Sequence, residues 1–142
     1  MTDFSKIHWQ PIEGLALLTE MVDGLLEETQ RFHATLSQAR ERPQVLGTAI
    51  LDRAVQQYGE RASWLDVYAE QFRRWQALPL TPPQQQEVDR LSREVEATRP
   101  VVGQVLALVE ELRFESAHRR RERSAAEQAL AELIGVPTSG DL

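Results

Sequence analysis

Apolar residues recur every three or four positions along three long segments of the chain. The first stripe contains Leu15, Leu18, Val22, Leu25, Thr29, Phe32, Leu36 and Ala39. The second contains Leu51, Ala54, Tyr58, Leu65, Tyr68, Phe72 and Trp75. The third contains Val88, Leu91, Val95, Thr98, Val102, Val105, Val109 and Leu112. Such spacing puts one side chain per turn on the same side of a helix, so it predicts three amphipathic, coiled-coil-like α-helices.

Prolines and one capping pattern place the ends of these helices at about 11–41, 43–77 and 82–122. Pro11 and Pro43 suit a first helical turn, where a missing N–H costs nothing. Thr81 and Gln84 have the spacing of a capping box, in which each side chain binds the other residue's backbone N–H. Pro100 removes one hydrogen bond inside the third helix, but the apolar stripe keeps its phase there. We therefore expect a continuous helix that is kinked at Pro100.

Short connectors between the long helices indicate that sequential helices are antiparallel neighbours. No segment alternates with a period of two, and no sheet is predicted. The sequence therefore predicts an all-α fold, an elongated up-down-up three-helix bundle in which residues 1–142 form a single domain. The N-terminal arm 1–10 and the tail 136–142 are expected to be flexible.

The C-terminal end of the third helix allows two interpretations. Ser124 and Glu127 have capping-box spacing and precede a further apolar stripe, which ends in Leu133 and Ile134 before Gly135. This pattern predicts a separate short helix at about 125–134. Because arginine and glutamate are good helix formers, an unbroken helix through Ser124 is the alternative.

Four arginines stand just before Ser124 and are the candidate anion-binding residues. They are Arg119, Arg120, Arg121 and Arg123. Clustered guanidinium groups bind phosphate, as in nucleic acids, and they also dock acidic proteins. However, Glu115 and Glu127 are spaced to pair with Arg119 and Arg123, no aromatic residue interleaves to stack bases, and the chain carries a net charge of −6. These features favour a solvated helix end whose cations oppose the helix dipole.

Glu115 and His118 are the weak candidates for a metal site. Carboxylate-bridged di-iron bundles use this Glu-x-x-His pair twice, whereas it occurs once here, so a dimer would have to supply the second copy. We interpret His118 as a surface residue near Glu122. The absence of cysteine excludes thiolate chemistry, and no catalytic triad or phosphate-binding loop is present. We expect no cofactor, no metal and no enzymatic activity.

The apolar stripes are wider than an isolated three-helix bundle needs. The predicted partner-binding residues are Trp64, Leu106, Leu108, Leu17 and Met21. The short C-terminal helix, a second copy of the chain or another protein would cover them. Gly103, within the most apolar stretch, is interpreted as the site of a close helix crossing. The sequence thus predicts a homodimer that also binds another protein.

The expected function is a non-catalytic protein–protein interaction module: an adaptor, an assembly chaperone or a small subunit of a complex. The longest nearly apolar run, residues 101–109, is too short to span a membrane, and the N-terminus lacks the layout of a secretion signal. We therefore expect a cytoplasmic protein. The alternatives are a nucleic-acid-associated small subunit that uses the arginine cluster and a carboxylate–histidine metalloprotein formed by dimerisation.

Overall fold

The computed structural model describes residues 3–42 and 45–135, and within these ranges every regular element is a helix. A short 3-10 turn, η1 (Ile12–Gly14), leads into α1 (Leu15–Val22) and α2 (Leu25–Ala39). Two long helices follow, α3 (Thr48–Gln76) and α4 (Pro82–Leu133). The all-α prediction is confirmed. Pro43 and the tail 136–142 lie outside the described residues. However, Gly47 has extended backbone and α3 begins only at Thr48, so the predicted helix start at 43 was wrong.

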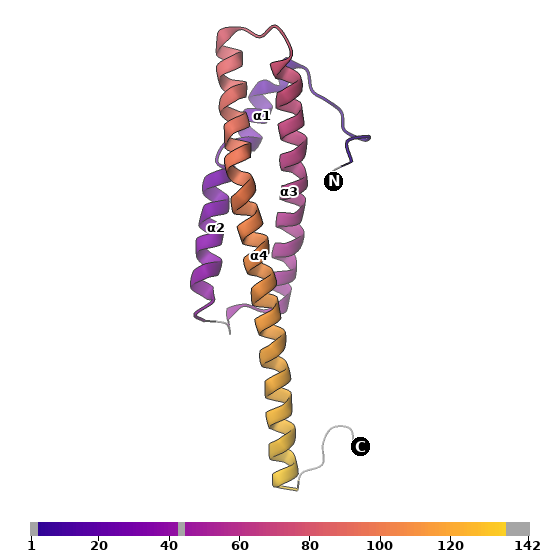
Figure 1. The fold of residues 1–142 in the computed structure, drawn as a ribbon, viewed down its shortest axis with the longest axis vertical. Coiled ribbons are helices and arrows are strands. Elements are labelled where there is room, and N and C mark those ends of the chain that lie inside the picture. The colour runs from indigo at the N-terminus through magenta and orange to yellow at the C-terminus, as the bar shows by residue number, and fades with distance from the viewer. Residues whose placement is uncertain (1–2, 43–44, 136–142) are drawn as a thin grey trace.

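Helix α4 is the element on which α1, α2 and α3 all pack (Figure 1). Near the beginning of α4, the Arg90 guanidinium donates to Asp23, just after α1, at 2.9 Å. Further along α4, Glu111 pairs with Arg40 at the end of α2. Asp23 thus contacts α4 near its start, and Arg40, at the end of α2, contacts α4 further along. It follows that α2 and α4 run in the same direction.

Helix α3 runs in the opposite direction to α4. Gln76, at the end of α3, donates from Nε2 to Asp89 Oδ1 near the start of α4 at 3.0 Å. Asp52, near the start of α3, pairs with Arg113 much later in α4 at 3.1 Å. We call the packed part of the molecule, residues 12–117, the body.

The core of the body follows the predicted stripes closely. Its most completely buried side chains are Val22, Leu51, Leu65, Phe72, Trp75, Val88, Leu91, Val95, Val102, Val105, Val109 and Leu112. Each fully buried large apolar side chain stabilises the fold by about 1.5–3 kcal/mol. Thr29 and Thr98 are buried as well, and each hydroxyl donates to the carbonyl four residues earlier, at 2.7 Å. This explains how two polar residues fit in apolar stripes.

The first predicted helix, 11–41, is interrupted at Asp23 and Gly24, so the prediction of one continuous helix was wrong. Gly24 has a φ of 84°, in the left-handed region that glycine adopts without a steric penalty. After the break, the Leu26 N–H donates to Glu94 Oε1 at 3.2 Å, which satisfies one of the unpaired donors at the start of α2. The apolar stripe keeps its phase across the break and therefore does not reveal it.

Helix α4 begins as predicted but continues further. Thr81 and Gln84 form the capping box, with the Gln84 N–H donating to Thr81 Oγ1 at 3.3 Å. The helix is unbroken at Pro100, as expected, while the predicted kink stays a prediction. It is also unbroken at Ser124, so the separate short helix at 125–134 was wrong and the alternative of a continuous helix was right.

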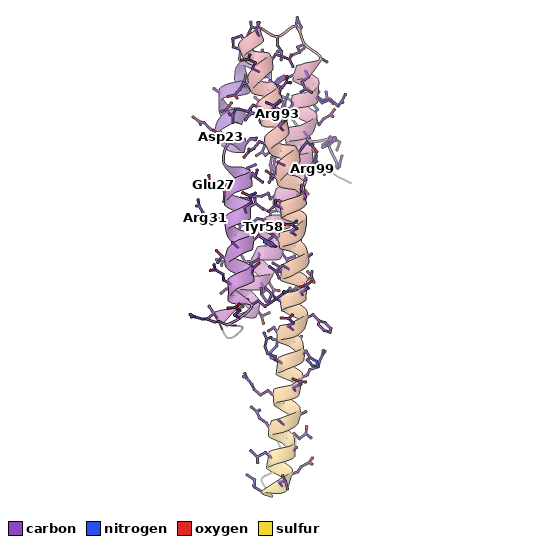
Figure 2. All side chains as sticks on the ribbon, turned by 60° about the vertical axis from the view of Figure 1, so that its left-hand side comes forward. Asp23, Glu27, Arg31, Tyr58, Arg93 and Arg99 are labelled. Atoms are coloured by element: carbon purple, nitrogen blue, oxygen red, sulfur yellow. The ribbon has the colours of Figure 1, made fainter. Side chains whose placement is uncertain are left out.

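The last part of α4 extends beyond the body (Figure 1). We call residues 118–134 the overhang, and at about 1.5 Å per residue it is about 25 Å long. All of its residues except Ala131 are exposed. Figure 2 shows its side chains projecting outward, in contrast to the crowded side chains of the body, although Arg120 near its start reaches Thr48 on α3.

Candidate functional site: an apolar groove beside the N-terminal arm

Three of the predicted partner-binding residues lie together in the structure. Leu17 and Met21 are one turn apart on α1, and Trp64 faces them from α3, with exposed fractions of 54%, 43% and 49%. All three line a groove of about 350 Å³, which we call the arm groove. Residues 6–10 of the N-terminal arm form its remaining wall. The arrangement leaves three large apolar side chains in contact with water around one hollow.

The floor of the arm groove is part of the core. Leu18 from α1 and Val67 from α3 are buried there. Tyr68, one turn after Trp64, stacks against the indole with ring centroids 5.9 Å apart. Burial raises the pKa of the Tyr68 hydroxyl above its ordinary value. The groove thus offers a firm apolar and aromatic surface, typical of sites that accept an apolar side chain.

Gln71, a buried residue of α3, fastens the arm to the body. Its Oε1 accepts from the Gln10 N–H at 2.7 Å, and its Nε2 donates back to the Gln10 carbonyl at 3.2 Å. The indole N–H of Trp75 donates to the same carbonyl at 2.8 Å. These three bonds satisfy the backbone N–H and carbonyl of Gln10, which lies outside any helix, with side chains of α3.

Trp9 provides a second attachment of the arm. The guanidinium of Arg74 lies over its ring, 4.3 Å from the centroid, a cation–π contact. Phe4 meets the same ring edge-on at 5.6 Å. The flexibility predicted for residues 1–10 stays a prediction, but these contacts place the arm against α3.

The other two predicted partner-binding residues lie elsewhere. Leu108 is buried, with 7% of its surface exposed, so its interpretation as a surplus apolar residue was wrong. Because α2 and α3 both pack on α4, the buried face of α4 is wider than one stripe. Leu106 is half-buried and borders a shallow recess between α3 and α4, next to Arg99 and Gly103.

The arginine cluster lies at the start of the overhang, not at a helix end. Its four residues are exposed, and α4 continues to Leu133, so the interpretation as the dipole-matched last turn was wrong. The predicted ion pairs of Arg119 with Glu115 and of Arg123 with Glu127 do not form within the described part of the chain. Arg120 donates to Thr48 Oγ1 on α3 at 3.2 Å.

The metal candidates do not come together with further ligands. His118 Nε2 lies 3.1 Å from Glu122 Oε1, as expected from the sequence, and its ring stacks on Phe114. Glu115 lies one turn earlier and is half-buried. Among residues 3–42 and 45–135, no group of three or more histidine, cysteine, aspartate or glutamate side chains is placed to hold a metal ion.

Sequence reasoning missed several residues of the arm groove. Tyr68 was assigned to the core stripe, although it also stacks on Trp64 at the rim. Ile7 and Gln71 were not singled out at all. Gln71 carried a usable signal, because a glutamine next to Phe72 in the buried phase of a helix needs a hydrogen-bonding partner.

Comparisons with protein-family models, with curated proteins and with solved structures give no match for this chain. Within the two described ranges, no helix has both the length and the apolar character that crossing a membrane requires. Of the surfaces that the described residues leave open, the arm groove is one that apolar side chains line for the most part.

Proposed function

We propose that this chain is a non-catalytic, cytoplasmic protein–protein interaction module, such as an adaptor, an assembly chaperone or a small subunit of a complex. It works as an up-down-up helical bundle whose arm groove binds an apolar segment of another protein. The observation that carries the proposal is the half-exposed trio of Leu17, Met21 and Trp64 around one apolar hollow. Contiguous exposed apolar surface on a folded protein marks interaction sites.

The groove geometry sets the strength of binding that we expect. Covering the exposed half of each of the three side chains contributes about 1 kcal/mol apiece, since complete burial contributes about 1.5–3 kcal/mol. Tryptophan is one of the residue types enriched among the anchors of such interfaces, so Trp64 should contribute most. The three side chains together contribute about 3 kcal/mol before the entropic cost of association, so we expect weak, transient binding.

The test compares two truncations of half-exposed apolar side chains on the same helix. Tagged full-length chain is used to capture partners from its native host, alongside Trp64→Ala and Ile50→Ala. Ile50 is the matched control, because it is an apolar residue of α3 with 52% of its surface exposed that does not line the arm groove. We expect a stoichiometric protein partner that Trp64→Ala loses and Ile50→Ala retains. A partner that both variants retain equally would refute the groove as the binding site.

The same capture addresses the alternative function of a nucleic-acid-associated small subunit. Four exposed guanidinium groups at the start of the overhang favour that alternative. Nuclease-sensitive material that is lost on Arg121→Glu, but kept on Trp64→Ala, would replace the first proposal with it. Stoichiometric metal in the captured sample would instead revive the Glu115 and His118 hypothesis.

We also propose that the chain forms a homodimer. Large exposed apolar side chains occur a second time toward the end of α4, at Phe114, Leu130 and Leu133, and at Ile134 directly after it. This region is separate from the arm groove, so dimerisation and partner binding do not compete for the same surface.

A further inference from the structure

We infer that the overhang is a dimerisation arm, which pairs in the antiparallel direction with the overhang of a second copy of this chain. The inference names the surface of the proposed homodimer and does not depend on what the arm groove binds. It rests on three features of residues 114–134: the phase of their apolar residues, the order of their charges, and the recess at the base of the overhang.

The spacing that buries α4 in the body continues into the overhang. After Val105, Val109 and Leu112, steps of three and four residues lead through Ser116, Arg119, Arg123 and Ala126 to Leu130 and Leu133. The tip of the overhang therefore presents apolar side chains on the face that packs against other helices in the body. Leu130 and Leu133 are 58% and 83% exposed, although they occupy core positions of this repeat. A helix with that repeat is suited to pack against another helix.

The charges of the overhang are ordered from positive to negative. Arg119, Arg120, Arg121 and Arg123 lie in its first third, with Glu122 among them, whereas the later charged residues are Glu127 and Glu132. In an antiparallel pair, the basic part of one copy lies beside the acidic part of the other, and the reverse contact forms by symmetry. A parallel pair would place arginines beside arginines. The charge order therefore selects a second copy in the antiparallel direction.

One charged pair illustrates this complementarity. Arg120 and Glu127 are seven residues apart, so they lie two turns apart on the same face, next to the Leu130 and Leu133 stripe. When Arg123 of one copy lies opposite Ala126 of the other, Arg120 of each copy comes beside Glu127 of its neighbour. The arginine cluster thereby gains the acidic partners that it lacks within its own helix.

The base of the overhang, residues 114–117, borders a recess that can receive the tip of the second copy, its residues 130–134. Phe114 is 69% exposed and borders a recess of about 370 Å³ where α4 leaves α3, together with Ser116, Ala117 and Thr48. In the antiparallel register described above, Leu133 of the second copy lies opposite Ser116. The tip is therefore placed over this recess.

The pairing has the properties of a closed interface. Because each copy contributes the same tip and the same base, the contact is two-fold and ends at a dimer. About half of residues 114–134 face the second copy in such a pair, so the contact is smaller than the roughly 20–30 residues per partner of a standard interface and suits a dimer that forms at micromolar concentrations.

The first experiment measures the mass of the full chain in solution by sedimentation equilibrium over a range of micromolar concentrations. We expect a dimer, and we expect Leu130→Asp with Leu133→Asp to raise the dissociation constant more than about a hundredfold. Leu17→Asp, in the arm groove, should leave the dimer intact. Circular dichroism and thermal unfolding of each variant establish that the body still folds. A monomeric wild-type chain, or a leucine double variant that remains dimeric, would overturn the inference.

The second experiment is a charge exchange. Arg120→Glu places like charges beside Glu127 of the second copy, so we expect it to weaken the dimer by about tenfold or more. Glu127→Arg should act similarly, and the double variant should recover most of the lost affinity. Arg93→Glu is the matched control, since Arg93 is an exposed arginine of α4 within the body with no ion pair in the described part of the chain. Losses that add up in the double variant, without recovery, would exclude this pairing.

The third experiment determines the direction of the helices. The chain has no cysteine, so single cysteines can be introduced without background. Ala126→Cys, near the centre of the antiparallel pair, should cross-link two copies on oxidation. Ile134→Cys should not, because the two tips would be about 28 Å apart, far beyond the Cα separation of about 7 Å that a disulfide allows. Efficient cross-linking at position 134 would indicate a parallel pair and refute the arrangement.

These experiments separate the dimer from the proposed function. If the chain dimerises through the overhang but captures no partner through Trp64, the inferred dimer is supported and the proposed function is refuted. A monomer whose partner is lost on Trp64→Ala gives the reverse result.

Discussion

Glycine has a different role at different positions of this chain. Gly24 holds the left-handed backbone between α1 and α2, whereas Gly103 lies on an exposed side of α4. A Cβ added at Gly103 would have no neighbouring atom within 4 Å, so the interpretation as a close helix crossing was wrong. The same substitution should therefore act in opposite directions at the two positions.

We predict that Gly24→Ala lowers the free energy of unfolding by about 1–2 kcal/mol, because alanine resists the left-handed conformation. Gly103→Ala should raise it by about 0.5–1 kcal/mol, because alanine favours the helix and has room there. Urea denaturation of the two variants beside the wild type measures both changes. A gain in stability at position 24 would contradict the left-handed turn.

Two tyrosines, the buried Tyr58 and the half-buried Tyr68, should make the fold sensitive to alkali. Tyr58 stacks on Phe32 with ring centroids 4.7 Å apart, and burial raises the pKa of its hydroxyl, although nearby Arg61 acts in the opposite direction. Burial raises the pKa of Tyr68 as well. In the unfolded chain both hydroxyls ionise near pH 10, at a lower pH than in the folded protein. Above about pH 10 the hydroxyls therefore ionise more readily in the unfolded chain than in the folded protein. Their ionisation stabilises the unfolded chain relative to the folded protein as the pH rises.

We therefore predict that the free energy of unfolding is unaffected by these groups below about pH 10 and falls above it. Denaturant midpoints measured from neutral to alkaline pH, with tyrosinate absorbance followed in parallel, test the prediction. Tyr58→Phe should lose less stability over the alkaline range than the wild type. Equal alkaline losses in the two proteins would mean that Tyr58 is not responsible.

At the level of elements, the arm depends on one glutamine of α3. Gln71→Leu removes both hydrogen bonds to Gln10 and leaves a backbone N–H without its partner, at a cost of about 1–3 kcal/mol. We predict faster amide hydrogen exchange over residues 4–10 and weaker binding at the arm groove. Gln76→Leu is the control, since Gln76 lies on the same helix but bonds to Asp89 and not to the arm. Unchanged exchange in Gln71→Leu would show that Trp9 and Trp75 hold the arm by themselves.

The sequence predicted the buried faces of the helices better than their ends. The stripes assigned Thr29 and Thr98 to the core correctly, because their spacing is set by helical geometry alone. The break at Gly24 was missed because two helices can keep one apolar phase across a turn. The end of α4 was misplaced because Ser124 and Glu127 match a capping box but are equally compatible with a helix interior. The capping-box pattern alone does not show whether the helix before it ends at Ser124.

The candidate site was predictable only in part for a related reason. Leu17, Met21 and Trp64 were recognised as surplus apolar residues from their positions around the helices. Their convergence on one groove depends on how α1 is set beside α3 and on where the arm runs. Both depend on contacts between residues more than 40 positions apart, such as Gln10 with Gln71. Periodicity contains no information about such contacts.

For the whole molecule, the length of α4 has a geometric consequence. At about 1.5 Å per residue, its 52 residues span about 78 Å without a joint. In the inferred dimer, the two bodies sit at opposite ends of a rod and hold their arm grooves at a fixed separation. A ligand with two apolar segments would gain avidity only if its linker matched that separation. The protein would then select its partners by the spacing between their sites as well as by their chemistry.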